Sequence, residues 1–448
     1  MLAFGLASVM LLIGMLLRAK IRYLRNMLVP ASVIGGIIGL LFMNMIEMTG
    51  AKIGIAVSSY SNIVNNLFTI SFISISLTGA SENEAGGIKN MLKGSLGLGI
   101  VWCFLYALTP LLAFGIIHIL GKKFNMDAIY GMLIQFAFCQ GPGQSVAYGT
   151  IFESYGWVNA TTVAVTLSAI GFIVAFLVGI PMARAGIRKG IAKRSGKLND
   201  AILKGYLSKN EQTVLMVKDT TCNSNIETLS FHFAVIGLCY ILALGIAKIL
   251  SYIPGFLGTS MSGMMFMNGM YAAYIVKFVM KKMNLDFLLE NTLQSKITGW
   301  TSDYLVVCAF MAISIKVIQA WAVPIIVVAI FITLVTFGVC VYFGQRFGGD
   351  NDFERTLGIY GTCTGTVPTG IALVRIVDPE FKTATSIELG ACNLVMLAST
   401  PIYILILGYA AGSIKEGIVL GGLGICALAY IGILKVTGCW GKKTISWK

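Results

Sequence analysis

Residues 128–150 read AIYGMLIQFAFCQGPGQSVAYGT, an apolar stretch that residues 139–145 (CQGPGQS) interrupt in the middle. Residues 356–376 read TLGIYGTCTGTVPTGIALVRI and are interrupted in the same way by residues 361–369. A straight helix across a bilayer would leave backbone groups of such a Gly- and Pro-containing stretch without hydrogen bonds, which is costly in hydrocarbon. Each stretch is therefore predicted to form a re-entrant hairpin that is shielded by protein and lines a watery cavity.

The composition of the whole chain predicts a membrane around these hairpins. Of 448 residues, 57% are hydrophobic and 12% are charged, whereas soluble domains carry about 25% charged residues. A spanning helix needs about 20 mainly apolar residues. We predict an all-α polytopic membrane protein in a lipid bilayer, with spans at about residues 2–17, 28–46, 62–80, 94–120, 158–182, 230–250, 258–280, 298–315, 319–344, 384–410 and 416–437.

The basic residues indicate the topology of these spans. The formal net charge is +14, but Lys and Arg lie between apolar runs, where they hold loops on the cytoplasmic side. With the N-terminus outside, about 27 of the 33 Lys and Arg lie inside. We therefore attribute the positive charge to membrane topology, and we expect no nucleic-acid partner.

The chain also divides into two similar parts. Residues 183–229 are predicted to form a cytoplasmic basic linker between residues 1–182 and 230–410, and residues 411–448 add one transmembrane helix and a cytoplasmic tail. Asn-Ala-Thr-Thr-Val follows the first hairpin and Thr-Ala-Thr-Ser-Ile follows the second, at similar spacing. Each half holds five spans and one hairpin, so an odd number of crossings inverts the second half. Two inverted repeats with paired hairpins are typical of secondary transporters.

Catalytic groups are scarce in this sequence. Its two histidines, His118 and His232, form no HExxH pattern, and no CxxC pair occurs among ten Cys. The glycines at 141 and 143 lack the third glycine and the preceding strand of a dinucleotide site. The longest polar segment, about 46 residues, is too short for a nucleotide-binding domain. We therefore expect no enzyme and no cofactor.

A carrier needs fewer groups, and the two hairpins supply them. Helix N-termini and free backbone N–H groups can hold a carboxylate, while sodium takes carbonyl and hydroxyl oxygens. We predict a shared site where the tips of the hairpins meet, although polar kinks satisfied within a helix bundle would show the same residues. The candidate substrate-binding residues are Gln140, Gly141, Gly143, Gln144, Ser145, Thr364, Gly365, Thr366, Pro368, Thr369 and Arg375.

Two further interpretations stay open at this stage. Arg375 either meets a leaving carboxylate or anchors its helix at the cytoplasmic surface. Thr161 and Thr385 occupy matching places behind the two hairpins, and with Asn393 they are the candidate sodium ligands. An interhelical hydrogen bond would explain Asn393 equally well.

The sequence resembles the bacterial glutamate:sodium symporters from near residue 2 to about 410. The matching features are residues 28–36 (LVPASVIGG), Gly141-x-Gly143, residues 155–161 (YGWVNAT), residues 181–184, Lys316, and Pro368-Thr369 with Ile371-Ala372. The resemblance implies sodium-driven uptake of glutamate across the bacterial inner membrane. It further implies an elevator-like or rocking movement of the hairpin domain, usually in a homodimer.

The chain departs from that family at the proposed site. Pro142 stands where the family reads His, the second hairpin is shorter by about three residues before Pro368, and the last span has no counterpart. We therefore expect a sodium-coupled carrier of glutamate or a similar small carboxylate. The alternatives are a carrier for another organic acid or amino acid with different ion coupling, and a gated ion channel.

Overall fold

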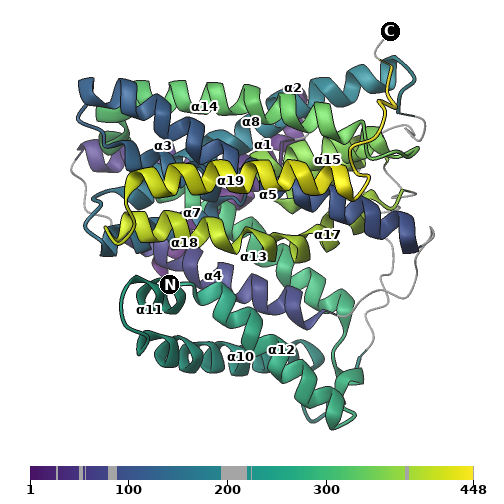
Figure 1. Ribbon diagram of the computed structural model, residues 1–448. Helices are drawn as coiled ribbons and strands as arrows, with labels where there is room; N and C mark the ends of the chain where they lie inside the picture. Colours follow the sequence, from purple (N-terminus) through teal and green to yellow (C-terminus); the bar gives the residue numbers. More distant parts are fainter. Residues whose placement is uncertain are drawn as a thin grey trace. The chain divides into compact units, whose positions relative to one another are not determined.

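The computed structural model describes residues 1–26, 29–49, 54–55, 57–78, 88–192, 219–222, 224–378 and 383–446. Within these residues the chain forms helices and no strand, as its composition predicts (Figure 1). In the described part of the chain, seven helices are long and apolar enough to cross a membrane, and a pair bent by 41° between residues 385 and 410 would make an eighth. These helices are those of a multi-pass membrane protein.

Three of the predicted spans form helices that are less apolar. They correspond to α4 (Val57–Leu77), to the pair α11 (Phe256–Gly263) and α12 (Met265–Lys282), and to α13 (Asn291–Met311). Their polar groups bond to neighbouring helices, since the Ser74 hydroxyl of α4 donates to the Gln294 carbonyl oxygen of α13 at 2.8 Å. Such groups lower hydropathy without facing lipid. That these helices also cross the bilayer stays a prediction.

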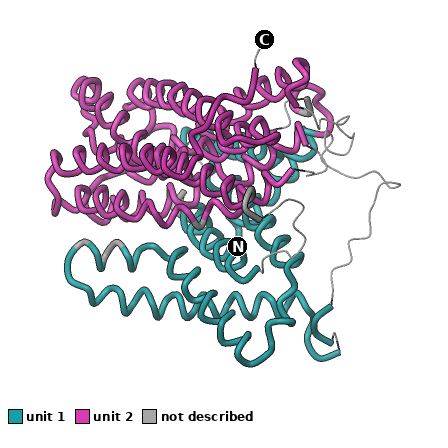
Figure 2. Tube along the Cα trace, turned by 45° about the vertical axis from the view of Figure 1, so that its right-hand side comes forward, with its two compact units in different colours: residues 1–18, 30–82, 204–313 teal, residues 19–29, 83–203, 314–448 magenta. Residues whose placement is uncertain are grey.

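The helices group into two compact units (Figure 2). Unit 1 comprises residues 1–18, 30–82 and 204–313, and unit 2 comprises residues 19–29, 83–203 and 314–448. Each half of the sequence therefore gives its first helices to unit 1, and its predicted hairpin with the flanking helices to unit 2. This equal division favours the predicted repeats, whose inversion stays a prediction.

Unit 1 is held by close helix packing. A Cβ atom on Gly14 would lie 2.6 Å from the backbone nitrogen of Gly35, so the two glycines let their helices approach closely. A buried apolar cluster that includes Ile73, Val235 and Ala272 joins three other helices. The helices of unit 1 besides α4 and α11 to α13 are α1 (Leu2–Lys20), α3 (Ala31–Thr49), α10 (Thr228–Ser251) and the short η3 (Asp286–Leu288).

Unit 2 contains both interrupted segments. Its long helix α5 packs against both α14 and α19 (Figure 1). The elements of unit 2 are α2 (Arg22–Asn26), α5 (Ile88–Leu120), η1 (Gly121–Lys123), η2 (Ala128–Leu133), α6 (Ile134–Phe138), α7 (Pro142–Ser154), α8 (Ala160–Arg188), α14 (Ile315–Gly344), α15 (Asp352–Thr364), α16 (Val367–Val377), α17 (Thr385–Val395), η4 (Met396–Ser399), α18 (Thr400–Ala410) and α19 (Glu416–Val436).

Both interrupted segments fold as helix–break–helix hairpins. In hairpin 1, formed by η2, α6 and α7, the rings of Phe136 and Tyr148 stack with centroids 3.8 Å apart across the break. In hairpin 2, formed by α15 and α16, a Cβ atom on Gly361 would lie 2.8 Å from Cα of Gly370, which shows direct backbone contact between its two helices. Neither helix of a hairpin is long enough to span a bilayer alone. Re-entry into the membrane from opposite sides stays a prediction.

Helix α8 extends into the predicted linker, and the C-terminal tail packs against hairpin 2. Helix α8 continues to Arg188, into the predicted linker 183–229, and most of that linker (residues 193–218 and 223) lies outside the described residues. The last helix, α19, is followed by a tail that returns to the start of hairpin 2. There Gly441 N–H donates to the Arg346 carbonyl oxygen at 2.8 Å, and Thr444 N–H donates to that of Gln345 at 2.9 Å.

Candidate functional site

The breaks of the two hairpins lie against each other in unit 2. A Cβ atom on Gly141 would overlap the methyl group of Thr366 and would lie 3.1 Å from the carbonyl oxygen of Gly365. Gly141 has φ +79°, a conformation that favours glycine. Helix α8 supports both breaks, since a Cβ atom on Gly171 would meet Thr364 of hairpin 2 and the Phe138 ring of hairpin 1. The predicted meeting of the tips is thus a feature of the structure.

Each break is followed by a helix that begins with a proline in its first turn. Pro142 is the first residue of α7, and Pro368 is the second residue of α16. A proline is tolerated there because the first N–H groups of a helix have no intrahelical acceptor. The first turn of α7 is closed by a hydrogen bond from Ser145 N–H to the Gly141 carbonyl oxygen, and that of α16 by one from Gly370 N–H to the Thr366 carbonyl oxygen.

These two helix starts create positive potential at the tips. The backbone N–H groups of Gly143 and Gln144 in α7, and of Val367 and Thr369 in α16, belong to the first turns. Such groups and the helix macrodipole attract anions. Because the two N-termini meet at the Gly141–Thr366 contact, their positive potentials add there.

The side chains at the tips divide into two groups. The Ser145 hydroxyl donates to the Gly141 carbonyl at 2.9 Å and the Thr364 hydroxyl to the Tyr360 carbonyl at 2.7 Å, so both are used within their own helices. The hydroxyls of Thr366 and Thr369 lie 3.1 Å apart at the tip of hairpin 2. These two hydroxyls bond to each other across the start of α16 and not to the backbone of their own helix.

The two glutamines of hairpin 1 bond to tyrosines that the sequence analysis did not single out. Gln140 Nε2 donates to the Tyr403 hydroxyl at 3.0 Å, and the Tyr106 hydroxyl donates to Gln144 Oε1 at 3.3 Å. Tyr106 lies on α5 and Tyr403 on α18. Nothing in their local sequence marks them, because aromatic residues are common in apolar helices. Only the packing of α5 and α18 brings them to the hairpin.

Arg375 lies away from the tips. It is exposed in the last turn of α16, eight residues after Val367, which is about 12 Å along a helix. This position agrees with the interpretation of Arg375 as an anchor at the end of its helix, and it is too far along α16 for a contact at the tips.

The two matched threonines share an unusual property. Thr161 Oγ1 and Thr385 Oγ1 are both buried and have no hydrogen-bond partner among the described residues. A buried hydroxyl left unsatisfied costs about 1–3 kcal/mol. Asn393, in contrast, is exposed and donates to the Gly390 carbonyl oxygen at 3.0 Å. Of the three sodium candidates, the two threonines thus have oxygens free for an ion.

Near these threonines, a carboxylate at the end of each hairpin bonds to the backbone of the following segment. The sequence analysis did not single out these two carboxylates. Glu153 Oε1 accepts the backbone N–H of Thr161 at 3.0 Å, and Asp378 Oδ2 accepts that of Thr383 at 2.8 Å. In each half, therefore, an acidic residue at the end of the hairpin bonds to the start of the next helix. In the sequence, an acidic residue shortly before each of the two matched Thr-containing segments could have indicated this bond.

A second polar region lies at the base of hairpin 2, at its far end from the tips. Arg355 forms two bonds to Glu388, of 2.7 and 2.5 Å, and one to Asp352 at 3.1 Å, and all three side chains are buried. Asp352 also accepts the hydroxyl of Thr444 in the C-terminal tail at 2.6 Å. This charge cluster joins α15, α17 and the tail.

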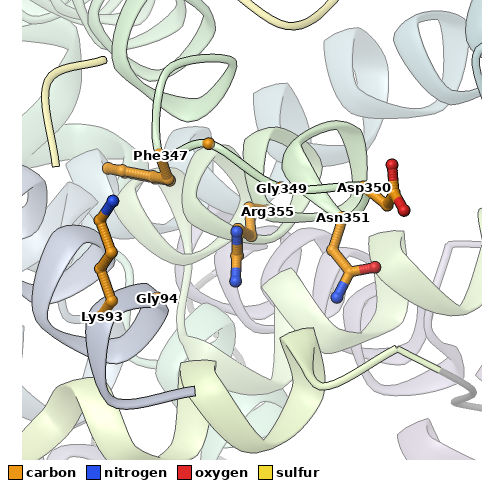
Figure 3. Close-up of a pocket in the computed structure, with 8 residues that line it drawn as sticks. Lys93, Gly94, Phe347, Gly349, Asp350, Asn351 and Arg355 are labelled. Atoms are coloured by element: carbon orange, nitrogen blue, oxygen red, sulfur yellow. The ribbon is translucent and has the colours of Figure 1, made fainter. Parts of the chain in front are cut away.

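A cavity of about 240 Å³ borders this charge cluster. It is lined by Lys93, Gly94, residues 347–351 and Arg355, and Figure 3 shows Lys93 beside Phe347 while the Asp350 carboxylate is directed away from the Lys93 side chain. The Arg355 guanidinium that lines it is already paired with two carboxylates. The cavity therefore has a different chemistry from the hairpin tips, and one of its two cationic side chains, Arg355, is engaged in a buried ion pair.

A comparison with protein families agrees with this arrangement. The family model described as sodium/glutamate symporter matches residues 1–383. The chain belongs to this family. Among curated proteins, none matches the chain.

Membership establishes the general role of this symporter. It is a membrane transport protein of a family that carries out symport, and the predicted resemblance is confirmed. The match ends at residue 383, short of the predicted limit near 410. Both hairpins lie inside the matched span, whereas Glu388, Tyr403, α19 and the tail lie beyond it.

Proposed function

We propose that this chain couples the inward movement of sodium to the uptake of glutamate or a similar small carboxylate across the bacterial inner membrane. The observation that carries the proposal is the contact of the two hairpin tips, where two helix N-termini meet beside the hydroxyls of Thr366 and Thr369. This arrangement suits a carboxylate held by backbone N–H groups near the middle of the membrane. The family match supports the same substrate and ion.

Sodium is proposed to bind behind the tips, at Thr161 and Thr385. Each offers a buried free hydroxyl near a carboxylate, and hydroxyl and carbonyl oxygens are the ligands that sodium takes in such carriers. Helix α7 contacts this region directly, since a Cβ atom on Gly149 would lie 3.0 Å from Thr161 Oγ1. An ion there would stabilise the same hairpin that binds substrate, so each ligand would raise the affinity for the other.

Coupled movement follows if only the fully loaded or the empty carrier crosses easily. Both hairpins belong to unit 2, so one body could carry substrate and ion together in an elevator-like or rocking movement. We further propose inverted repeats around this site, re-entrant hairpins and a homodimer.

Uptake into proteoliposomes tests the function. Labelled glutamate should accumulate above its external concentration under an inward sodium gradient, and should not do so when potassium replaces sodium. Accumulation that is independent of sodium would refute the coupling. Unitary currents without accumulation would instead identify a channel.

Thr161→Val and Thr385→Val should each weaken sodium activation. Removal of one oxygen ligand is expected to raise the sodium concentration for half-maximal uptake about five-fold, which corresponds to about 1 kcal/mol of coupling. The maximal rate at saturating sodium should change less. Thr162→Val on the same helix is the matched control, because its partly exposed side chain is not a proposed ligand. Unaltered sodium dependence in both variants would remove the threonines from the ion site.

Arg375→Gln should leave glutamate uptake within about two-fold of the native value, because an exposed helix-end cation contributes little beyond anchoring. The measurement is the KM for glutamate at saturating sodium. A large rise in KM would show instead that Arg375 binds the carboxylate.

A further inference from the structure

Three long helices of unit 2 have their ends together beside the C-terminal tail. The Cys439 thiol, just after α19, donates to the carbonyl oxygen of Lys93 in the first turns of α5 at 3.6 Å. The next part of the tail bonds to the end of α14, since Gly441 N–H donates to the Arg346 carbonyl oxygen at 2.8 Å. The start of α5 and the ends of α14 and α19 therefore form one surface.

This surface carries cations that the protein does not use internally. Four lysines are exposed, and their ammonium groups make no hydrogen bond or ion pair within the described residues; they are Lys93, Lys435, Lys442 and Lys443. The neighbouring acids Asp352 and Glu388 are buried and bonded to Arg355. The exposed acid Asp350 is directed away from the Lys93 side chain (Figure 3). The exposed charge of this surface is thus mainly positive.

Aromatic rings lie next to these cations. The Arg346 guanidinium lies over the Tyr342 ring, 3.8 Å from its centroid. The Trp440 ring has its centroid 6.2 Å from that of Tyr342 and 5.5 Å from that of Phe343. Tyr342 and Trp440 remain 41% and 36% exposed. Exposed Trp and Tyr beside Lys and Arg are typical of the level at which a membrane protein meets lipid headgroups.

The last turns of α19 extend this surface toward the hydrocarbon. Ile433 is 38% exposed and Val436 is 89% exposed, four residues before Trp440. Along this side of the protein, apolar side chains are followed by aromatic rings and then by ammonium groups. A phospholipid has the same order of chemistry, with acyl chains, a glycerol backbone and a charged headgroup.

We propose that residues 93, 342–346 and 433–443, here called the tail surface, bind an anionic phospholipid. Its acyl chains pack on α19, its glycerol region lies against the two exposed rings, and its phosphate lies among the lysines. A net negative headgroup is required, because a zwitterionic lipid brings its own ammonium group to a surface of unpaired cations. The inference is independent of the transported substrate. Most of the tail surface lies beyond residue 383, where the family match ends.

Lipid bound there would also hold the base of hairpin 2. The Thr444 hydroxyl of the tail donates to Asp352 at 2.6 Å, and Thr444 N–H donates to the Gln345 carbonyl oxygen at 2.9 Å. Fixing the tail therefore strengthens contacts that the start of α15 makes. A ligand that binds only the folded protein raises its melting temperature, which gives a measurement that needs no transport.

The test measures thermal unfolding of the full chain in neutral detergent micelles as phosphatidylglycerol is added. The melting temperature should rise and reach a plateau, whereas phosphatidylcholine should cause little change. Lys442→Gln/Lys443→Gln should raise the phosphatidylglycerol concentration for the half-maximal shift by about 10- to 30-fold, since each Lys near an anionic surface contributes about fivefold in affinity. Both lysines are exposed, so the variant should fold as the native protein does.

Lys122→Gln/Lys123→Gln is the matched control. These two exposed lysines follow α5 at its other end, and their loss changes the net charge equally. The control should keep the native half-maximal concentration. Equal stabilisation by phosphatidylcholine or by inorganic phosphate alone would overturn the inference. A native response in Lys442→Gln/Lys443→Gln, or an equally weakened one in the control, would also overturn it. None of these results would affect the proposed function.

Discussion

Substitution of Gly141 by alanine or leucine is expected to lower sodium-driven uptake by about 100-fold or more, since a misplacement of about 1 Å can cost that much. Gly141 has φ +79°, which disfavours any L side chain. Its Cβ would also overlap the Thr366 methyl group and crowd the Gly365 carbonyl oxygen. The two hairpin tips would be pushed apart, and the first turns of α7 and α16 would no longer face one ligand.

Gly115→Leu is the control for this prediction. Gly115 also lies in unit 2, on α5, but a Cβ atom there would meet nothing within 4 Å. Both variants should elute as the native protein does in size-exclusion chromatography, so that the loss in Gly141→Leu is one of transport. Uptake by Gly141→Leu within two-fold of native would show that the tip contact is not needed.

Substitution of Glu388 by leucine is expected to destabilise the protein by about 3–5 kcal/mol, because the Arg355 guanidinium would lose its main partner while it stays buried. Glu388 accepts two of the three bonds that Arg355 makes to carboxylates, and its side chain has no exposed surface. Arg355→Met should have an equally large effect, because it leaves the Glu388 charge without its partner. The measurement is thermal unfolding in detergent for each variant.

The double variant Arg355→Met/Glu388→Leu distinguishes charge from packing. It removes both charges together, and a well-packed apolar pair can be as stable as a buried ion pair. We therefore expect the double variant to be more stable than either single one. A double variant whose loss equals the sum of the two single losses would show that the pair is not coupled.

Much of the fold could be predicted from local sequence. The breaks at 139–145 and 361–369 are visible because Gly and Pro interrupt apolar runs, and these residues act on the backbone wherever they occur. The prolines at 142 and 368 likewise mark helix starts without reference to any other segment. The contact of the tips was predicted from the matched pattern of the two halves. In the structure this contact lies where Gly141 packs on Thr366.

Other features could not be found in this way. The sequence analysis counted the basic residues only as signals of topology and did not single out Arg355, which the structure buries between Asp352 and Glu388. Tyr106 and Tyr403 are 297 residues apart, and nothing in either local sequence indicates the other. The division into units also joins segments from both halves rather than following the predicted linker.

The sequence by itself determined the membrane class, the helical content and the two hairpins, because hydropathy and the backbone effects of Gly and Pro are local properties. Only the tertiary structure decided which polar groups are free. Ser145 and Thr364 are used within their own helices, whereas the hydroxyls of Thr161 and Thr385 have no partner among the residues that the structure describes. A hydrogen bond depends on what packs within about 3 Å of an atom, and in this protein that neighbour often comes from a helix hundreds of residues away.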